Sequence, residues 1–407
     1  MANPTQAPRS QHVGPVNSGH RIHYILPAII ILTAFGWNYA YLRVIFSRYF
    51  PIIYLRTSNQ QILQEVQEFD AAAATLWRID THAHFIPPFY YEVLRRMGLD
   101  SGGRAVPEWN AEDHLALMDK LRIETAILSI STPGARLPGH TLQEARTLAR
   151  EVNNYGHMMS ITYPDRFKFY ATLVLPDVEG SIEEAIHALD TLQAAGVALL
   201  ANSEGQYLGR PEFDPLMEVL NSRGAIIFVH PSSLPDCTSA SEHEGGGKNL
   251  KVPPPFVVDF LLDTTRAAGN LVMNNVTGRY PNLRWTLAHS GGFLPFAAYR
   301  MAGALSLVTR VPVESLVAEF QKFYADTALS SSHSALPSTI AFLTSEHITF
   351  GSDFPFAPNT VIEKETAQLD TFLVNLLDQK NQINYGNADR LFGNRLTTES
   401  TRLNGEV

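Results

Sequence analysis

Short apolar runs rich in β-branched residues alternate with amphipathic stretches from residue 76 to residue 395. The runs have the length and composition of buried strands, and the stretches have the spacing of helices with one apolar face. We therefore predict strands at 76–79, 125–130, 167–174, 197–201, 225–230, 285–289, 322–327 and 347–351. Helices are predicted between them, including 142–159, 182–195, 213–223 and 256–277.

This alternation predicts an α/β fold, because a helix that crosses from one strand to the next makes the strands parallel. Eight such units close most naturally into a (β/α)8 TIM barrel, here over residues 76–395. A doubly wound open sheet is the alternative, but no glycine-rich phosphate turn follows the first strand to favour it. Of two long loops, 87–110 and 231–255, each is expected to form a lid or a wall of the site. A disordered insert is the alternative for the second.

The first 75 residues have another pattern. Residues 1–23 are polar and predict a disordered N-terminus. The segment 24–46 is mostly uncharged and predicts an N-terminal hydrophobic helix that just reaches the length of a bilayer crossing, followed by a helical spacer at 47–75. Because more arginines follow the segment than precede it, we expect a single-pass membrane protein with a cytosolic catalytic domain. A helix that packs on the globular domain is the alternative. Residues 396–407 are predicted to be a polar tail.

Composition and charge narrow the functional classes. The net charge is −9 and no basic block occurs, which argues against a nucleic-acid partner and favours a small-molecule one. A single cysteine, Cys237, excludes an internal disulfide framework.

Residue types that bind metals stand at the ends of four predicted strands. His82 and His84 follow the first strand, and residues two apart on a strand point to the same side. His230, His289 and Asp353 stand at the ends of three others. Taken singly, each is more often a hydrogen-bonded histidine or a capping aspartate. In a barrel, however, all strand C-termini open on one face, so the convergence of five favours a functional metal site.

Four motifs, in their order along the chain, resemble one branch of the amidohydrolase superfamily. They are HAH at 82–84, VHP at 229–231, AHSGGFLPF at 288–296 and FGSDFPFAP at 350–358. This branch holds aminocarboxymuconate-semialdehyde, γ-resorcylate and 6-methylsalicylate decarboxylases, and the resemblance covers residues 77–392. The stretches LMDKLRIETAILSIS at 117–131, LVLPDVEGS at 173–181 and FYADTALS at 323–330 are similar to the 6-methylsalicylate type.

The resemblance implies a barrel of the metal-dependent hydrolase type in which His82, His84, His230 and Asp353 bind one divalent metal ion, most often zinc. His289 would be a catalytic group beside the metal, and a protonated Asp353 would deliver a proton to the ring carbon that loses carbon dioxide. The strand at 197–201 carries no lysine to be carboxylated, which disfavours a binuclear hydrolase centre.

Three further residues are predicted to bind the substrate. Arg300 is similar to an arginine that, in the semialdehyde decarboxylases, reaches into the neighbouring subunit's site, which implies a homodimer. A surface salt bridge is the alternative. Trp109 and Phe293 are expected to stack on an aromatic ring, with core packing as an equal alternative.

The predicted function is therefore the metal-dependent, non-oxidative decarboxylation of a small aromatic carboxylic acid, such as 6-methylsalicylate to m-cresol, in polyketide secondary metabolism. Two alternatives stay open at this point. One is a hydrolase of a lactone or amide, in which Asp353 activates water with the same ligands. The other is an inactive, membrane-tethered scaffold.

Overall fold

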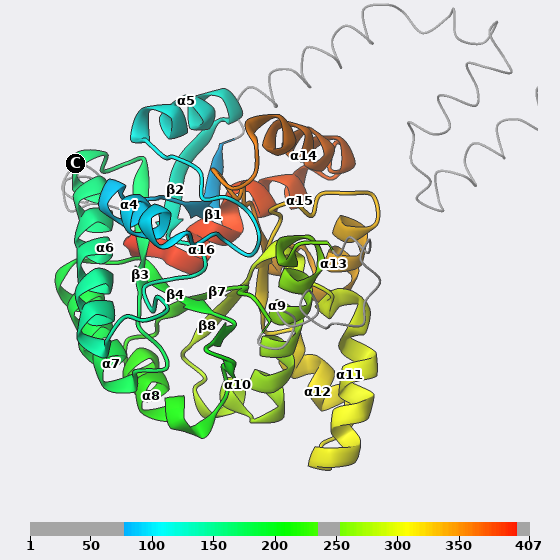
Figure 1. The fold of residues 1–407 in the computed structure, drawn as a ribbon. Helices are drawn as coiled ribbons and strands as arrows, with labels where there is room; N and C mark the ends of the chain where they lie inside the picture. The colour runs from blue at the N-terminus through cyan, green and yellow to red at the C-terminus, as the bar shows by residue number, and fades with distance from the viewer. Residues whose placement is uncertain (1–76, 235–252, 397–407) are drawn as a thin grey trace, which may run out of the picture. The chain divides into compact units, whose positions relative to one another are not determined.

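The computed structural model describes residues 77–234 and 253–396 (Figure 1). Its centre is a sheet of eight parallel strands in the order β1-β2-β3-β4-β7-β8-β9-β10. The strands are β1 Arg78–His84, β2 Ile123–Ser129, β3 Phe167–Thr172, β4 Gly196–Leu200, β7 Ile226–His230, β8 Arg284–Leu287, β9 Tyr324–Asp326 and β10 Ile348–Thr349. All eight predicted strands are thus confirmed.

The sheet curves into a nearly closed barrel. The backbone N–H of Thr81 in β1 donates to the carbonyl oxygen of Phe350, just after β10, at 2.9 Å. The first strand is longer than predicted, since it extends to His84 and is buried along its whole length between β2 and the β10 segment. The two histidines therefore lie within β1 and not after it.

Helices cover the outside of the strands (Figure 1). They are α4 Pro88–Met97, α5 Ala111–Leu121, α6 Leu142–Thr162, α7 Val178–Ile186, α8 Asp214–Ser222, α9 Pro255–Met273, α10 Val276–Arg279, α11 Leu294–Thr309, α12 Val313–Phe320, α13 Ala335–Leu343, α14 Asn359–Phe372, α15 Leu377–Asn381 and α16 Asn387–Phe392. A short antiparallel pair, β5 Asn202–Ser203 with β6 Gln206–Tyr207, lies outside the barrel sheet.

Helix α6 illustrates how the local sequence sets an element. The Thr141 hydroxyl accepts from the Glu144 N–H at 3.2 Å, and the Glu144 carboxylate accepts from the Thr141 N–H at 2.8 Å. This reciprocal cap satisfies backbone donors that the first helical turn leaves free. Further along α6, a Cβ at Gly156 would come within 2.8 Å of the Phe169 ring, so the glycine lets the helix lie close against β3.

Side chains fill the barrel beneath the site. Tyr170 and Phe228 stack with ring centroids 5.2 Å apart, and Ile79 and Ile127 belong to the same buried cluster. The Tyr170 hydroxyl donates to the Thr81 carbonyl oxygen at 3.1 Å. The Phe228 ring in turn lies 4.8 Å from the ring of His82. The barrel interior is therefore a packed floor on which the first histidine rests.

The predicted membrane localisation is corrected. Within residues 77–234 and 253–396, no helix combines the length and the apolar character that a bilayer crossing requires. The predicted N-terminal hydrophobic helix at 24–46, the disordered segment at 1–23 and the spacer at 47–75 lie outside the described residues.

We expect Gly196→Ala to lower the free energy of unfolding by about 1–3 kcal/mol, as overpacking does. A Cβ at Gly196 in β4 would lie 2.5 Å from the carbonyl oxygen of Ile226 in the neighbouring strand. The control is Gly303→Ala in α11, where a Cβ meets nothing within 4 Å and should instead stabilise the helix by about 0.5–1 kcal/mol. Chemical denaturation measures both, and equal effects would contradict the close approach of β4 and β7.

Candidate active site

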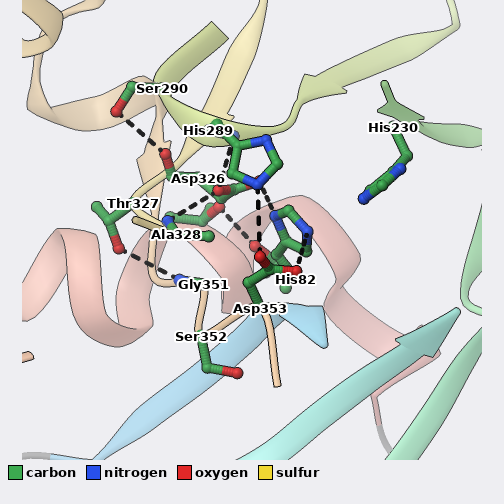
Figure 2. A network of polar contacts seen from close by, with 12 residues as sticks. His82, His230, His289, Ser290, Asp326, Thr327, Ala328, Gly351, Ser352 and Asp353 are labelled. Carbon is green, nitrogen blue, oxygen red and sulfur yellow. Dashed lines mark hydrogen bonds and ion pairs between the residues drawn. The ribbon is translucent and has the colours of Figure 1, made fainter. Parts of the chain in front are cut away.

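Four side chains that could bind one metal ion converge at the C-terminal end of the barrel strands. His82 and His84 come from β1, His230 from the end of β7, and Asp353 from the segment after β10. One nitrogen or oxygen of each lies within 4.8 Å of the corresponding atoms of the other three, and all four residues are buried. Figure 2 shows His230 facing His82 and Asp353 across the space between them. The structure thus brings together the whole predicted ligand set.

The distances within the cluster are short. The Nε2 atoms of His82 and His84 lie 3.2 Å apart. Oδ1 of Asp353 lies 3.4 Å from His82 Nε2 and 3.1 Å from His84 Nε2. His289 is close by, with its Nε2 3.7 Å from Oδ2 of Asp353, so the fifth predicted residue is placed beside the cluster.

The other ring nitrogen of each histidine already has an acceptor. The Nδ1 contacts are Asp326 Oδ2 for His82 at 2.9 Å, the Ser129 carbonyl oxygen for His84 at 3.2 Å, and the Pro231 carbonyl oxygen for His230 at 2.8 Å. An Nδ1 that donates its proton to such an oxygen leaves the Nε2 of the same ring as the atom that can offer a lone pair to a metal ion. Outer partners of this kind are what orient histidines for metal binding.

The electrostatics of the cluster favour a cation. Burial lowers the pKa of His84, and burial together with the positive charge of neighbouring histidines holds the pKa of His230 well below its usual range. Burial also opposes a charge on His82, but the carboxylates of Asp326 and Asp353 outweigh it and raise the pKa of His82 to about 10. The field around His82 therefore attracts positive charge.

The carboxyl of Asp353 is ionised. Burial disfavours its charge, but contacts with His289, His82 and His84 outweigh burial and hold the pKa of Asp353 well below its usual range. Three imidazoles and one carboxylate converge in a buried space, and a metal ion would take the place of the proton that the raised pKa of His82 otherwise favours. This is the donor set of a divalent metal site. The residues present therefore fit one divalent metal ion.

Asp326, at the end of β9, is a site residue that the sequence analysis did not assign. It is fully buried, and its Oδ1 accepts from the N–H of His289 at 3.1 Å and of Ala328 at 2.9 Å, while Oδ2 contacts His82 (Figure 2). The stretch FYADTALS contains it, and it ends a strand as the other site residues do. The same strand-end criterion applied to this strand would have identified it.

The backbone at the site is held in left-handed conformations that non-glycine residues rarely adopt. His289, Ser290 and Asp353 have φ of 54°, 57° and 60°. Each such conformation costs about 1–3 kcal/mol and persists only because the surrounding structure enforces it. The enforcing contacts include the Asp353 N–H to the His82 carbonyl oxygen at 2.8 Å and the His289 N–H to Asp326. The two side chains are therefore pre-positioned by the fold.

A cavity of about 680 Å³ opens onto the cluster. His230, His289 and Asp353 line it, and much of the remaining wall is apolar. The aromatic side chains in this wall are Phe256, Phe260, Phe293, Phe296 and Phe356. Among its lining residues, Arg104 alone carries a guanidinium or ammonium group. We therefore regard Arg104, which the sequence analysis did not assign, as the cationic member of the candidate site.

The three residues predicted to bind substrate lie in different surroundings. Phe293 lines the cavity. Trp109 is buried away from the cavity lining, where its indole N–H donates to Nδ1 of His114 at 3.2 Å. Arg300 lies on an exposed part of α11 and does not line the cavity of its own chain.

Comparisons with known proteins agree with this geometry. The family model described as amidohydrolase matches residues 79–394. A protein named decarboxylase yanB from Aspergillus niger is 36% identical over 77% of this chain and 87% of its own length. A protein named 6-methylsalicylic acid decarboxylase from Penicillium expansum is 32% identical over 77% of this chain and 96% of its own length.

Solved structures share the fold. A crystal structure of an amidohydrolase II superposes with a TM-score of 0.70 at 29% identity, covering 77% of this chain and 99% of that one. A dihydroxybenzoic acid decarboxylase from Polaromonas, crystallised with bound manganese, superposes with a TM-score of 0.66 at 20% identity, covering 79% of this chain and 98% of that one.

We expect Asp326→Asn to weaken the binding of a divalent metal about 10- to 100-fold, the usual cost of removing an outer partner of a metal-binding histidine. The amide cannot supply the negative charge that Asp326 places 2.9 Å from His82 Nδ1. Competition with a chromophoric chelator measures the affinity. Asp370→Asn, on α14 and outside the cavity lining, is the matched control. An unchanged affinity in Asp326→Asn would remove this residue from the metal site.

Proposed function

This chain belongs to the amidohydrolase family, and we propose that it is a carboxy-lyase that decarboxylates a small aromatic hydroxy acid such as 6-methylsalicylate. The observation that carries the proposal is the cluster of His82, His84, His230 and Asp353, which opens onto a cavity with aromatic walls and one cation, Arg104. The relatives named as decarboxylases support this reaction over lactone or amide hydrolysis and over an inactive scaffold.

We propose zinc as the metal, because imidazole nitrogens and carboxylate oxygens are ligands that zinc commonly binds in enzymes. Manganese is the competing choice, since the dihydroxybenzoic acid decarboxylase of the same fold was crystallised with it. When bound, the ion stabilises negative charge on the carboxylate and hydroxyl oxygens of the substrate.

The cavity walls orient the substrate. The Arg104 guanidinium attracts the anionic acid, and the rings of Phe293 and Phe356 offer faces and edges against which an aromatic ring can pack. With these apolar walls around the reacting carbon, less water screens the charges of the site. The cavity that opens onto the cluster is therefore the binding space that we assign to the aromatic acid.

Asp353 accepts and then returns the proton of the reaction. Its depressed pKa means that it is ionised when the substrate arrives, so it accepts the proton of the ortho-hydroxyl group. The bond between the ring carbon and the carboxylate then breaks, its electron pair stays on the ring carbon, and Asp353 returns the proton to that carbon. His289, 3.7 Å from Asp353, positions the carboxyl for both transfers. This route differs from our expectation that Asp353 meets the substrate already protonated.

The direct test is to incubate the purified, metal-loaded protein with 6-methylsalicylate and to measure m-cresol and carbon dioxide by mass spectrometry. We expect equal amounts of the two products. Absence of decarboxylation across a panel of ortho-hydroxybenzoates, together with cleavage of a lactone or an amide, would overturn the proposal.

We expect Asp353→Asn to lower kcat about 10²- to 10⁴-fold, the range over which a positioned acid–base group acts. An amide cannot carry the proton between the hydroxyl group and the ring carbon. Metal content and thermal stability, measured in parallel, separate loss of the proton carrier from loss of the ion or the fold. Asp389→Asn, on an exposed position of α16, is the matched control and should retain full activity. Full activity of Asp353→Asn would exclude the proton-carrier role.

We expect Arg104→Gln to raise KM about 10-fold or more with a smaller change in kcat, since a hydrogen bond to a charged group contributes about 1.5–3 kcal/mol. Steady-state kinetics with 6-methylsalicylate measure this. Arg300→Gln is the same substitution on exposed α11 and should leave KM unchanged in a monomer. A raised KM in Arg300→Gln, together with a dimer in sedimentation, would instead support the predicted homodimer. An unchanged KM in Arg104→Gln would contradict its assignment.

A further inference from the structure

A second cavity, of about 220 Å³, borders the cluster at His230. Its walls come from residues of β3, β4 and β7 and from the segments that follow β2, β3, β4 and β7. Among the residues that the structure describes, His230 alone lines both this cavity and the larger one. One ligand of the metal cluster therefore stands between two separate spaces.

The walls of the smaller cavity suit a small neutral molecule. Apolar side chains such as Leu173, Leu199 and Leu200 line it. Thr172 also lines it, and its hydroxyl is buried and has no hydrogen-bond partner within the described part of the chain. The charged groups in the lining neutralise one another, because Nε of Arg136 lies 3.1 Å from Oε1 of Glu204. No unpaired charge in this lining would hold an anion, while Thr172 can donate one hydrogen bond.

The two cavities differ in which residues of the site line them. Asp353 and His289 line only the larger cavity, so an aromatic acid that exchanges a proton with Asp353 must occupy that space. After the carbon–carbon bond breaks, the ring still fills the larger cavity, while the carboxylate carbon has become carbon dioxide. Its electron pair has stayed on the ring carbon, which takes the proton from Asp353. A small neutral product thus forms while the aromatic product obstructs the way that the substrate came in.

We propose that the smaller cavity is the exit passage and transient binding site of carbon dioxide. This rests on the proposed decarboxylase function. Carbon dioxide passes His230, accepts a hydrogen bond from Thr172 and leaves between the apolar walls, past the Arg136–Glu204 ion pair. The aromatic product leaves separately through the larger cavity.

Two exchange reactions of the metal-loaded enzyme separate the passages. In the first, m-cresol in deuterium oxide exchanges its ring hydrogen at the carbon that had carried the carboxylate, which requires the larger cavity and Asp353 but no carbon dioxide. In the second, ¹³C-labelled carbon dioxide enters the carboxylate of 6-methylsalicylate in the presence of m-cresol. This reaction requires the larger cavity and Asp353, and it also requires that carbon dioxide reach the site. The ratio of the second rate to the first reports access of carbon dioxide alone.

The matched variants are Ser203→Phe in the smaller cavity and Ser338→Phe in the larger one, both at half-buried serines. We expect Ser203→Phe to lower the ratio about 10-fold, because it adds a barrier only to carbon dioxide. Ser338→Phe should leave the ratio unchanged, because it hinders the aromatic ring in both reactions. If Ser203→Phe does not fold, Ala198→Leu narrows the same cavity from β4 and carries the same expectation.

An unchanged ratio in the folded smaller-cavity variant would overturn the passage. So would a fall in ring exchange alone, because that result would assign the cavity to water and proton supply. Failure of the proposed function is a different result, in which the parent protein supports neither exchange with any ortho-hydroxybenzoate and its decarboxylated product.

Discussion

The structure depends on a concentration of lone pairs and negative charge that only a cation can balance. Acceptors at the Nδ1 atoms of three buried imidazoles direct their Nε2 atoms toward one point, and two buried carboxylates, Asp326 and Asp353, lie within the same network. Without a positive charge, these groups would repel one another in a medium that screens poorly. The metal-binding role therefore follows from the hydrogen bonds behind the ligands as much as from the ligands themselves.

The closing seam of the barrel holds this arrangement in place. The carboxylate of Asp80 accepts from the N–H groups of His82 at 3.0 Å and Ser352 at 3.1 Å, which ties β1 to the segment that carries Asp353. The left-handed backbone at Asp353 is enforced by a contact of the same seam, and that at His289 by its hydrogen bond to Asp326 of β9. The strained backbone at these positions holds the side chains of His289 and Asp353 toward the same point of the site before any substrate binds.

Two cavities of different chemical character border the site. The larger cavity offers aromatic walls, a cation and access to Asp353, while the smaller one offers apolar walls, a neutralised ion pair and an unpartnered hydroxyl. His230 separates them. Separate routes suit a decarboxylase, because its two products differ greatly in size and polarity. A hydrolase that forms two polar products has less use for an apolar second route.

The eight strands could be predicted from the sequence because strand periodicity is local, and the convergence of five strand-end residues followed because a barrel brings all strand ends to one face. The choice of four of the five as metal ligands came from the resemblance of the motifs. Asp326 could have been predicted as a site residue in the same way, because it lies at the end of a predicted strand. Arg104, the exposed position of Arg300 and the burial of Trp109 were decided by the tertiary structure, since loops and helix faces have no periodicity that fixes where a side chain points. The second cavity is likewise formed by strands that are distant in the chain and pack together in the fold. No local sequence pattern could therefore predict it.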